Sequence, residues 1–218
     1  MICAIHQPQY LPYLGFFDKI RQADVFVLLD NCQFKKNEWQ NRNRIRDKEG
    51  WQWLTVPVIQ RFGQSINEVK INNTLNWRHK HIQAILLNYP QSPKHRKEFF
   101  RNSLDREWNY LVDINIHFII YLMDAFEINT KMIRASEEVH LMDIHSQATD
   151  RLIEICEKMG ADTYLSGPGG KEYLEVEKFK HIKLKFQEFN HPTYTQQFKG
   201  FIPFLSSIDY LFNCGGKI

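Results

Sequence analysis

ICAIHQPQYLPYLGFFDKIRQADVFVLLDNCQF, residues 2–34, is the stretch from which the fold can be deduced. The apolar run at residues 2–5 is short enough for a buried strand, and residues 25–29 form a second such run. Between them, residues 14–23 carry apolar side chains at helical spacing. Strand, loop, helix and strand in this order predict one βαβ unit with two parallel strands.

Polar side chains follow both predicted strands at the point where each strand ends. His6, Gln7 and Tyr10 come after the first strand, and Asp30 and Gln33 come after the second. The carboxyl ends of parallel strands meet at one edge of a sheet, where open α/β sheets bind their ligands. We therefore expect these side chains to form a site at that edge.

The next segment, KKNEWQNRNRIR at residues 35–46, is dense in basic and amide side chains. A guanidinium group binds phosphate or carboxylate oxygens with two hydrogen bonds, so the segment favours an anion site over a solvated loop, which is the alternative. Trp39 could stack on a base or a sugar ring, or it could belong to the core. The candidate ligand-binding side chains of this segment are Lys36, Gln40, Asn41, Arg42 and Arg44.

The remainder of the chain alternates helices and strands without an internal repeat. Alternating or apolar runs predict strands at residues 51–58, 66–71, 130–134, 163–165 and 182–189. Helical patterns predict helices at residues 77–89, 98–101, 110–126, 172–178 and 204–212, and one more that ends at Gly160 and is capped by His145 or Ser146. This order predicts one α/β domain over residues 1–218, with a helical middle region.

A glycine-rich loop, SGPGG at residues 166–170, lies between a predicted strand and a predicted helix. Such a loop can bring backbone amides onto a phosphate, so Ser166 and Gly167 are candidates for the site, although a plain connecting turn is an equal alternative. It lacks the GK[ST] ending of a Walker motif. His79 and His81 are two residues apart and point to different faces of a helix, and we predict no metal site.

Composition narrows the class of protein. A net charge of +3 over 218 residues argues against a strongly basic nucleic-acid binder, while leaving room for a local cationic pocket. The four cysteines are far apart, as in a cytosolic protein with reduced thiols. The N-terminus lacks the basic start and apolar core of a signal peptide, and no apolar run approaches the roughly 20 residues that span a bilayer. We expect a cytoplasmic protein without a membrane span.

Several motifs together resemble the WbqC-like family over essentially the whole chain. They are HQPQYLPYLGFFDKI, DNCQFKKNEWQNRNRI, WQWLTVPV, WRHKH, GADTYLSGPGGKEYL, FQEFNHPTY and FIPFLSSIDYLFN. The resemblance implies a role in bacterial surface-polysaccharide and O-antigen (lipopolysaccharide) biosynthesis, where a transferase activity is suspected. The positions that match the motifs are His6, Gln7, Asp30, Gln33, Gln40, Asn41, Arg42, Arg44, Trp77, His81, Ser166, Gly167, Gln187, His191 and Pro192.

The N-terminal unit is also similar to the first βαβ of nucleotidylyltransferases and pantothenate synthetases, which implies a Rossmann-like, nucleotidylyltransferase-like core. The HxGH motif of those enzymes is absent, and residues 12–15 stand in its place. ATP use through that motif is therefore not expected, and a likeness of fold does not establish the chemistry.

The primary hypothesis is a transferase that moves an acyl or aminoacyl group onto an amino sugar of a nucleotide sugar. His6 is the expected general base, Asp30 would orient it, and Lys36 would stabilise developing negative charge. The expected substrate-binding residues are Gln7, Tyr10, Gln33, Gln40, Asn41, Arg42, Arg44, His81, Ser166, Gly167 and His191.

Two alternatives come from other classes: a nucleotide-sugar or partner-binding protein without catalysis, and an ATP-dependent nucleotidyltransferase or ligase. Cys32 as a nucleophile is a minor alternative within the enzyme class. The pattern identifies neither a cofactor nor an oligomeric state. The mechanism requires His6, Asp30 and residues 36–44 to converge on one cleft, which the C-terminal half reaches through Ser166–Gly167 or His191.

Overall fold

The computed structural model describes residues 1–216, and contacts divide the chain into two compact units. Unit 1 comprises residues 1–8, 15–32 and 128–190, and unit 2 comprises residues 9–14, 33–127 and 191–218. A single domain over residues 1–218 stays a prediction.

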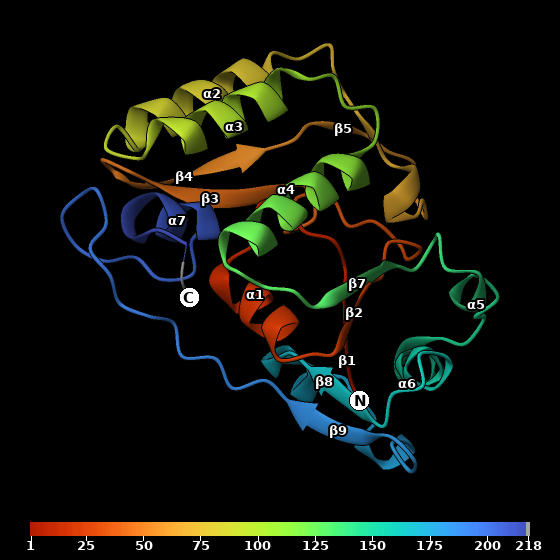
Figure 1. Cartoon of the computed structure of the whole chain (residues 1–218). Helices are drawn as coiled ribbons and strands as arrows, with labels where there is room; N and C mark the ends of the chain where they lie inside the picture. The colour runs from red at the N-terminus through yellow and green to blue at the C-terminus, as the bar shows by residue number, and fades with distance from the viewer. Residues whose placement is uncertain (217–218) are drawn as a thin grey trace. The chain divides into compact units, whose positions relative to one another are not determined.

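Unit 1 is built on a five-stranded sheet in which every neighbouring pair of strands is parallel. The strands are β1 (Ile2–His6), β2 (Val25–Leu28), β7 (Lys131–Arg134), β8 (Thr163–Ser166) and β9 (Lys183–Phe186). They lie in the order β7-β2-β1-β8-β9, so the chain builds one half of the sheet outward from β1 and then returns to build the other half (Figure 1). This arrangement confirms the predicted α/β class with a Rossmann-like βαβ core.

The helices of unit 1 connect the parallel strands, and apolar side chains fill both faces of the sheet. Helix α1 (Leu14–Arg21) joins β1 to β2, and the Phe16 ring packs 5.4 Å from the Phe26 ring of β2. Cys3, Ile5, Val25 and Val27 point to the opposite face and share a core with Ile155 and Cys156. That second core includes α6 (Ala148–Lys158), which together with the short α5 (Val139–Met142) leads from β7 to β8.

Unit 2 contains an antiparallel hairpin and four helices. The hairpin pairs β3 (Arg42–Asp47) with β4 (Gly50–Thr55), and a second small ladder pairs β5 (Val58–Ile59) with β6 (Lys70–Ile71). The helices are α2 (Trp77–Asn88), α3 (Lys94–Asp105), α4 (Leu111–Ala125) and α7 (Ser207–Cys214). Helices α2 and α3 run side by side (Figure 1), and α2, α3 and α4 form the predicted helical middle region.

The hairpin of unit 2 buries one face, and its other face is partly exposed at Arg42 and Arg44 and buried at Arg46. Asn43, Ile45 and Leu54 point inward and are almost fully buried. Because successive side chains of a strand alternate between faces, Arg42 and Arg44 share the outer face with Trp53. This alternation produces the surface described below.

The structure corrects several of the predicted elements. Residues 66–71 form a 3-10 helix (Ile66–Glu68) followed by a two-residue strand, and residues 172–178 contain parts of two 3-10 turns (Pro168–Glu172 and Val176–Lys178). Residues 42–47, for which no element was predicted, form a strand, and the strand predicted at residues 182–189 spans only residues 183–186. Helix α3 extends well beyond the predicted residues 98–101. The sequence shows little of it because the helix buries only Phe100, Ser103 and Leu104, which leaves a weak apolar pattern. Helix α6 begins after Gln147, and the Ser146 hydroxyl donates to Glu154 instead of capping it.

Within residues 1–216, no helix is both long and apolar enough to cross a membrane. In the same range, no group of three or more His, Cys, Asp or Glu side chains is arranged to hold a metal ion.

Candidate functional site

His6 lies at the carboxyl end of β1, at the ligand-binding edge of the unit 1 sheet. Its Nδ1 is 2.9 Å from the carbonyl oxygen of Gln7. A carbonyl oxygen only accepts, so Nδ1 carries the proton and Nε2 keeps its lone pair. Burial, followed by the charge of Lys19, lowers the pKa of His6 to about 4. The imidazole is therefore neutral at pH 7 and presents a weak base at Nε2.

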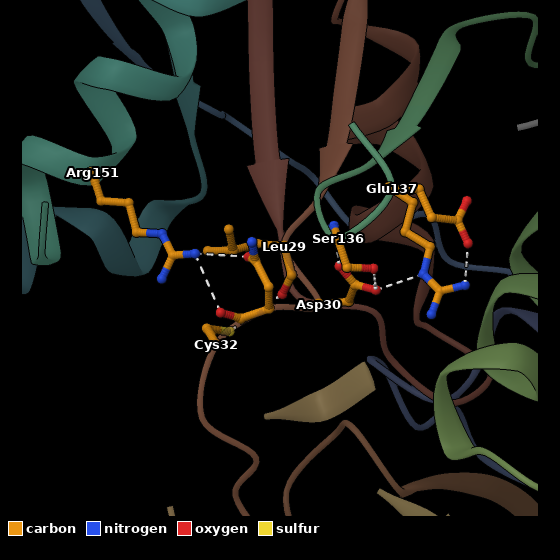
Figure 2. Close-up of polar contacts among 8 residues, drawn as sticks. Leu29, Asp30, Cys32, Ser136, Glu137 and Arg151 are labelled. Atoms are coloured by element: carbon orange, nitrogen blue, oxygen red, sulfur yellow. Dashed lines mark hydrogen bonds and ion pairs between the residues drawn. The ribbon is translucent and has the colours of Figure 1, made fainter. Parts of the chain in front are cut away.

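Asp30 follows β2 and is fully buried, and its carboxylate is committed to unit 1 itself. It accepts hydrogen bonds from Arg134 Nε at 2.6 Å, Ser136 Oγ at 2.7 Å and the Ser136 amide at 2.9 Å. Arg134 also pairs with Glu137 at 2.6 Å. Figure 2 shows Ser136, from the segment that follows β7, in contact with Asp30, and the Glu137 carboxylate in contact with the guanidinium of Arg134. The carboxylate joins the ends of β2 and β7 instead of contacting His6.

Asn31 and Cys32 continue the same edge, and Asn31 contacts helix α6. Arg151 Nη2 donates to the Asn31 side-chain oxygen at 2.7 Å and to its carbonyl oxygen at 3.2 Å. The Cys32 thiol donates to the Leu29 carbonyl and accepts from Gln7 Nε2, both at 3.2 Å (Figure 2 shows the first contact). Burial raises the pKa of Cys32, which argues against a thiolate nucleophile.

The end of β8 brings Ser166, and the loop that follows brings Gly167, to the same edge of unit 1. The β1–β8 register ends at Ala4 opposite Leu165, so His6 and Gly167 each lie two residues beyond the last pair. Ser166 is fully buried and donates to the Gly167 carbonyl at 3.0 Å. A Cβ on Gly170 would lie 2.0 Å from Ser166 Oγ, which explains why the loop needs glycine there. A Cβ added to Gly167 or Gly169 would meet no atom within 4 Å.

In unit 2, the outer face of the β3–β4 hairpin carries stacked tryptophan and arginine side chains. We call Trp39, Arg42, Arg44, Trp51 and Trp53 the Trp–Arg face. The Arg42 guanidinium lies 4.1 Å from the Trp53 ring centre, and that of Arg44 lies 5.0 Å from Trp51 and 5.6 Å from Trp39. Each of the three tryptophans is between 36% and 40% exposed, which is unusual for residues of this size.

The two arginines of this face have no carboxylate partner among residues 1–216. The Nε atoms of Arg42 and Arg44 are buried without a hydrogen bond, and neither side chain forms an ion pair. A stacked guanidinium is held flat by the ring and keeps its outer N–H groups available. The face therefore presents fixed cationic donors beside three aromatic surfaces.

The amide side chains of the same segment are used by the backbone. The Gln40 side chain accepts from the Lys35 amide at 2.8 Å, and the Asn41 side chain donates to Val56 at 3.0 Å. Both are buried, so their described contacts are structural. Gln33 and Lys36 are exposed in the loop that precedes β3.

Tyr10 and His81 form a buried pair in the core of unit 2. The Tyr10 hydroxyl lies 2.9 Å from His81 Nδ1, and burial lowers the pKa of His81 to about 3. Tyr10 is 0% exposed and His81 is 4% exposed, so their contacts are those of core residues. His191 also belongs to unit 2, where its ring lies 5.0 Å from Phe204 and 5.8 Å from Phe201.

The structure thus gathers one set of predicted residues in each unit. His6, Gln7, Asp30, Ser166 and Gly167 lie at the carboxyl edge of the unit 1 sheet, and Lys36, Arg42 and Arg44 belong to unit 2. Convergence of the two sets on one cleft stays a prediction.

Comparison with known proteins gives the context for these two sites. The model of the WbqC-like protein family matches residues 7–217. The chain belongs to the WbqC-like family. A relative in Mycobacterium tuberculosis (strain ATCC 25618 / H37Rv), named uncharacterized protein Rv1507c, is 31% identical over 223 residues, covering 98% of this chain and 94% of the relative. No solved structure gives a significant match.

Sequence reasoning missed several polar residues of this family member. Arg134 is the last residue of β7 and Ser136 follows that strand as Asp30 follows β2, so the strand-end rule could have identified them. Arg151 and Lys19 lie within helices, where no local pattern marks them. Trp51 and Trp53 lie in a strand that the sequence predicts. Only the pairing of this strand with β3 shows that the two rings stack on the arginines.

Proposed function

We propose that the protein transfers an acyl or aminoacyl group onto the amino sugar of a nucleotide sugar, in bacterial surface-polysaccharide biosynthesis. The observation that carries the proposal is the Trp–Arg face, because a nucleotide sugar combines a flat base with two phosphates. Stacking of a base on an aromatic side chain contributes about 1–3 kcal/mol. Arg42 and Arg44 would bind the diphosphate with charge-assisted hydrogen bonds. Membership of the WbqC-like family supports the polysaccharide context.

The proposed chemistry assigns the proton transfer to His6. The amino-sugar nitrogen attacks the carbonyl carbon of an activated acyl donor, a C–N bond forms, and the bond to the leaving group breaks. The proton lost by the nitrogen moves to His6 Nε2, which the Nδ1 hydrogen bond to Gln7 leaves unprotonated, and then to the leaving group. Lys36 would stabilise the negative charge that develops on the carbonyl oxygen.

The first test is ligand binding. Titration with uridine- and thymidine-diphosphate amino sugars should quench tryptophan fluorescence, since three of the five tryptophans lie on the Trp–Arg face. Replacing both Arg42 and Arg44 with alanine should weaken binding at least about tenfold, since a charged hydrogen bond contributes about 1.5–3 kcal/mol.

The matched control is Arg101→Ala, which removes an exposed arginine of α3 in the same unit. It should leave the affinity unchanged. Unchanged affinity in the folded Arg42/Arg44 variant would remove the Trp–Arg face from the proposal.

One observation favours binding without catalysis as the second candidate function. The Asp30 carboxylate accepts from Arg134 and Ser136, and the imidazole of His6 is oriented by the Gln7 carbonyl instead. Under this alternative the Trp–Arg face would still bind the nucleotide sugar. Incubation of the bound sugar with acyl-thioester and aminoacyl donors, followed by mass spectrometry, separates the two functions, because only the transferase yields an N-acylated product.

A further inference from the structure

Lys19 is a buried cation of unit 1 that has no carboxylate partner. It lies in α1 and is 3% exposed, and its Nζ donates to the Ile5 carbonyl at 2.8 Å. The adjacent Asp18 is engaged with Arg21, Gln22 and Gln187 instead. No ion pair of the described residues 1–216 includes Lys19.

The Ile5 carbonyl marks where this ammonium lies in the sheet. The carbonyls of Ile2 and His6 accept from the Asp24 and Leu29 amides, on the side of β2. Successive carbonyls of a strand point to opposite sides, so the Ile5 carbonyl faces β8. The β1–β8 register ends one residue earlier, at Ala4 opposite Leu165. Lys19 Nζ therefore occupies the point where β1 and β8 separate.

This point is the topological switch of the unit 1 sheet. From β1 the chain adds β2 and then β7 on one side, and it returns to add β8 and β9 on the other side. Open parallel sheets bind ligands in the crevice outside the carboxyl ends of the two strands at such a switch. The switch is bordered by His6 on β1 and by the loop of Gly167 and Gly169 after β8, where a Cβ added to either glycine would meet no atom within 4 Å.

A positive charge at this position is costly for the folded protein alone. Taking an ammonium out of water without a counterion costs several kcal/mol, and a methionine could fill the same volume without that cost. The titratable groups that interact with Lys19 are the thiols of Cys3 and Cys156 and the imidazole of His6, and burial lowers the pKa of Lys19 to about 8. The ammonium is thus mostly charged at pH 7 and has one carbonyl acceptor for its three protons.

We propose that Lys19 and the Gly167–Gly169 loop form a phosphate-binding site at the switch point between β1 and β8. The site belongs to unit 1 and is distinct from the Trp–Arg face of unit 2. It goes beyond the nucleotide-sugar proposal, because it would accept the phosphate of a second substrate or of an acyl phosphate donor.

The test separates the two anion sites by working in the Arg42→Ala/Arg44→Ala background. Inorganic pyrophosphate is titrated by calorimetry into this background with and without Lys19→Met. We expect pyrophosphate to bind the background protein, and Lys19→Met to weaken that binding at least about tenfold, as loss of a charged hydrogen bond predicts. Absence of binding in the background, or equal binding with Lys19→Met, would overturn the proposal. If the Trp–Arg face does not bind anions, the wild type and the Arg42→Ala/Arg44→Ala protein should instead bind pyrophosphate equally.

A second measurement needs no Lys19 variant, in case Lys19→Met does not fold. Sulfate keeps its charge between pH 7 and pH 9, so its affinity for the background protein should fall across this range as Lys19 loses its proton. In protein labelled with ¹³C-lysine, the Cε signal that titrates near pH 8 should titrate at higher pH in saturating sulfate. An unchanged midpoint would contradict the proposal. Equally tight binding of acetate would overturn the assignment to phosphate.

Discussion

At the scale of single residues, position at the open strand end, and not burial, separates candidate ligand-binding side chains from side chains that hold the fold, since Lys19 is 3% exposed and His81 is 4% exposed. His6 and Lys19 carry polar groups at an open strand end, while Asp30, Tyr10 and His81 use their polar atoms within the protein. The sequence predicted His6, Asp30, Tyr10 and His81 alike as site residues and did not mark Lys19, because residue type and position relative to a strand do not show which partner a distant segment supplies. Arg134, the partner of Asp30, is 104 residues away.

Replacing Asp30 with asparagine should destabilise the protein strongly. The change leaves the Arg134 guanidinium, whose side chain is only 22% exposed, without its buried counterion, and such a loss typically costs about 3–5 kcal/mol. The control is Glu137→Gln, which removes the 67%-exposed second partner of the same arginine and should cost at most about 1 kcal/mol. Urea denaturation measures both, and equal effects would show that the burial of Asp30 has no energetic consequence.

The stability of the protein should fall as the pH is lowered from about 6.5 towards 4. The pKa values of His6 and His81 are lowered to about 4 and about 3, whereas an unfolded imidazole titrates near 6.5. Between these values the unfolded chain binds more protons than the folded chain, so acid favours unfolding.

His81→Asn should flatten this dependence, since an amide oxygen can still accept from the Tyr10 hydroxyl but does not titrate. The control is His79→Asn, which removes an exposed imidazole of the same helix. Thermal unfolding measured at several pH values checks the slopes. Parallel curves for the wild type and His81→Asn would contradict the expectation.

At the scale of elements, strong local patterns could be read from the sequence, and elements stabilised by distant contacts could not. The apolar runs of β1 and β2 and the stripe Trp77–His81–Ile85 of α2 predicted their elements to within about a residue or two. Strand β3 was missed because its sequence, RNRIRD, has only one apolar side chain and therefore no apolar alternation. Its pairing with β4 decides its conformation. The Trp–Arg face depends on that pairing, so the sequence predicted its members Trp39, Arg42 and Arg44 and not the contribution of Trp51 and Trp53.

Gly170→Ala should disturb the loop that follows β8. The added Cβ would lie 2.0 Å from Ser166 Oγ and 2.9 Å from Leu174 Cδ1, so one of them must move, at a cost of about 1–3 kcal/mol. Gly169→Ala is the control, since its Cβ would meet no atom within 4 Å. Ser166→Ala should relieve part of the cost of Gly170→Ala in a double-mutant cycle. Chemical denaturation measures the free energy of unfolding of each variant. If the effects of Gly170→Ala and Ser166→Ala are strictly additive, the added Cβ does not clash with Ser166.

At the scale of the whole molecule, the primary hypothesis requires that the two candidate sites serve one substrate. If they do, a saturating nucleotide sugar should slow hydrogen exchange both in residues 36–46 and at the carboxyl end of β1, as measured by mass spectrometry. Protection confined to residues 36–46 would leave the Trp–Arg face as a separate binding surface. The Arg42/Arg44 double variant is the control, since the ligand should protect neither segment in it.

The path of the chain between the two units has a consequence for how the protein is made. Strand β1 is synthesised first, but its partner β8 begins 161 residues later, after the long central part of unit 2. During translation the edge of β1 that pairs with β8 and the edge of β2 that pairs with β7 stay unpaired until those strands are synthesised. Contacts of this sequence separation form slowly. The nascent chain should therefore depend on chaperones until residue 186 has left the ribosome, and slower synthesis at low temperature should raise the yield of folded protein.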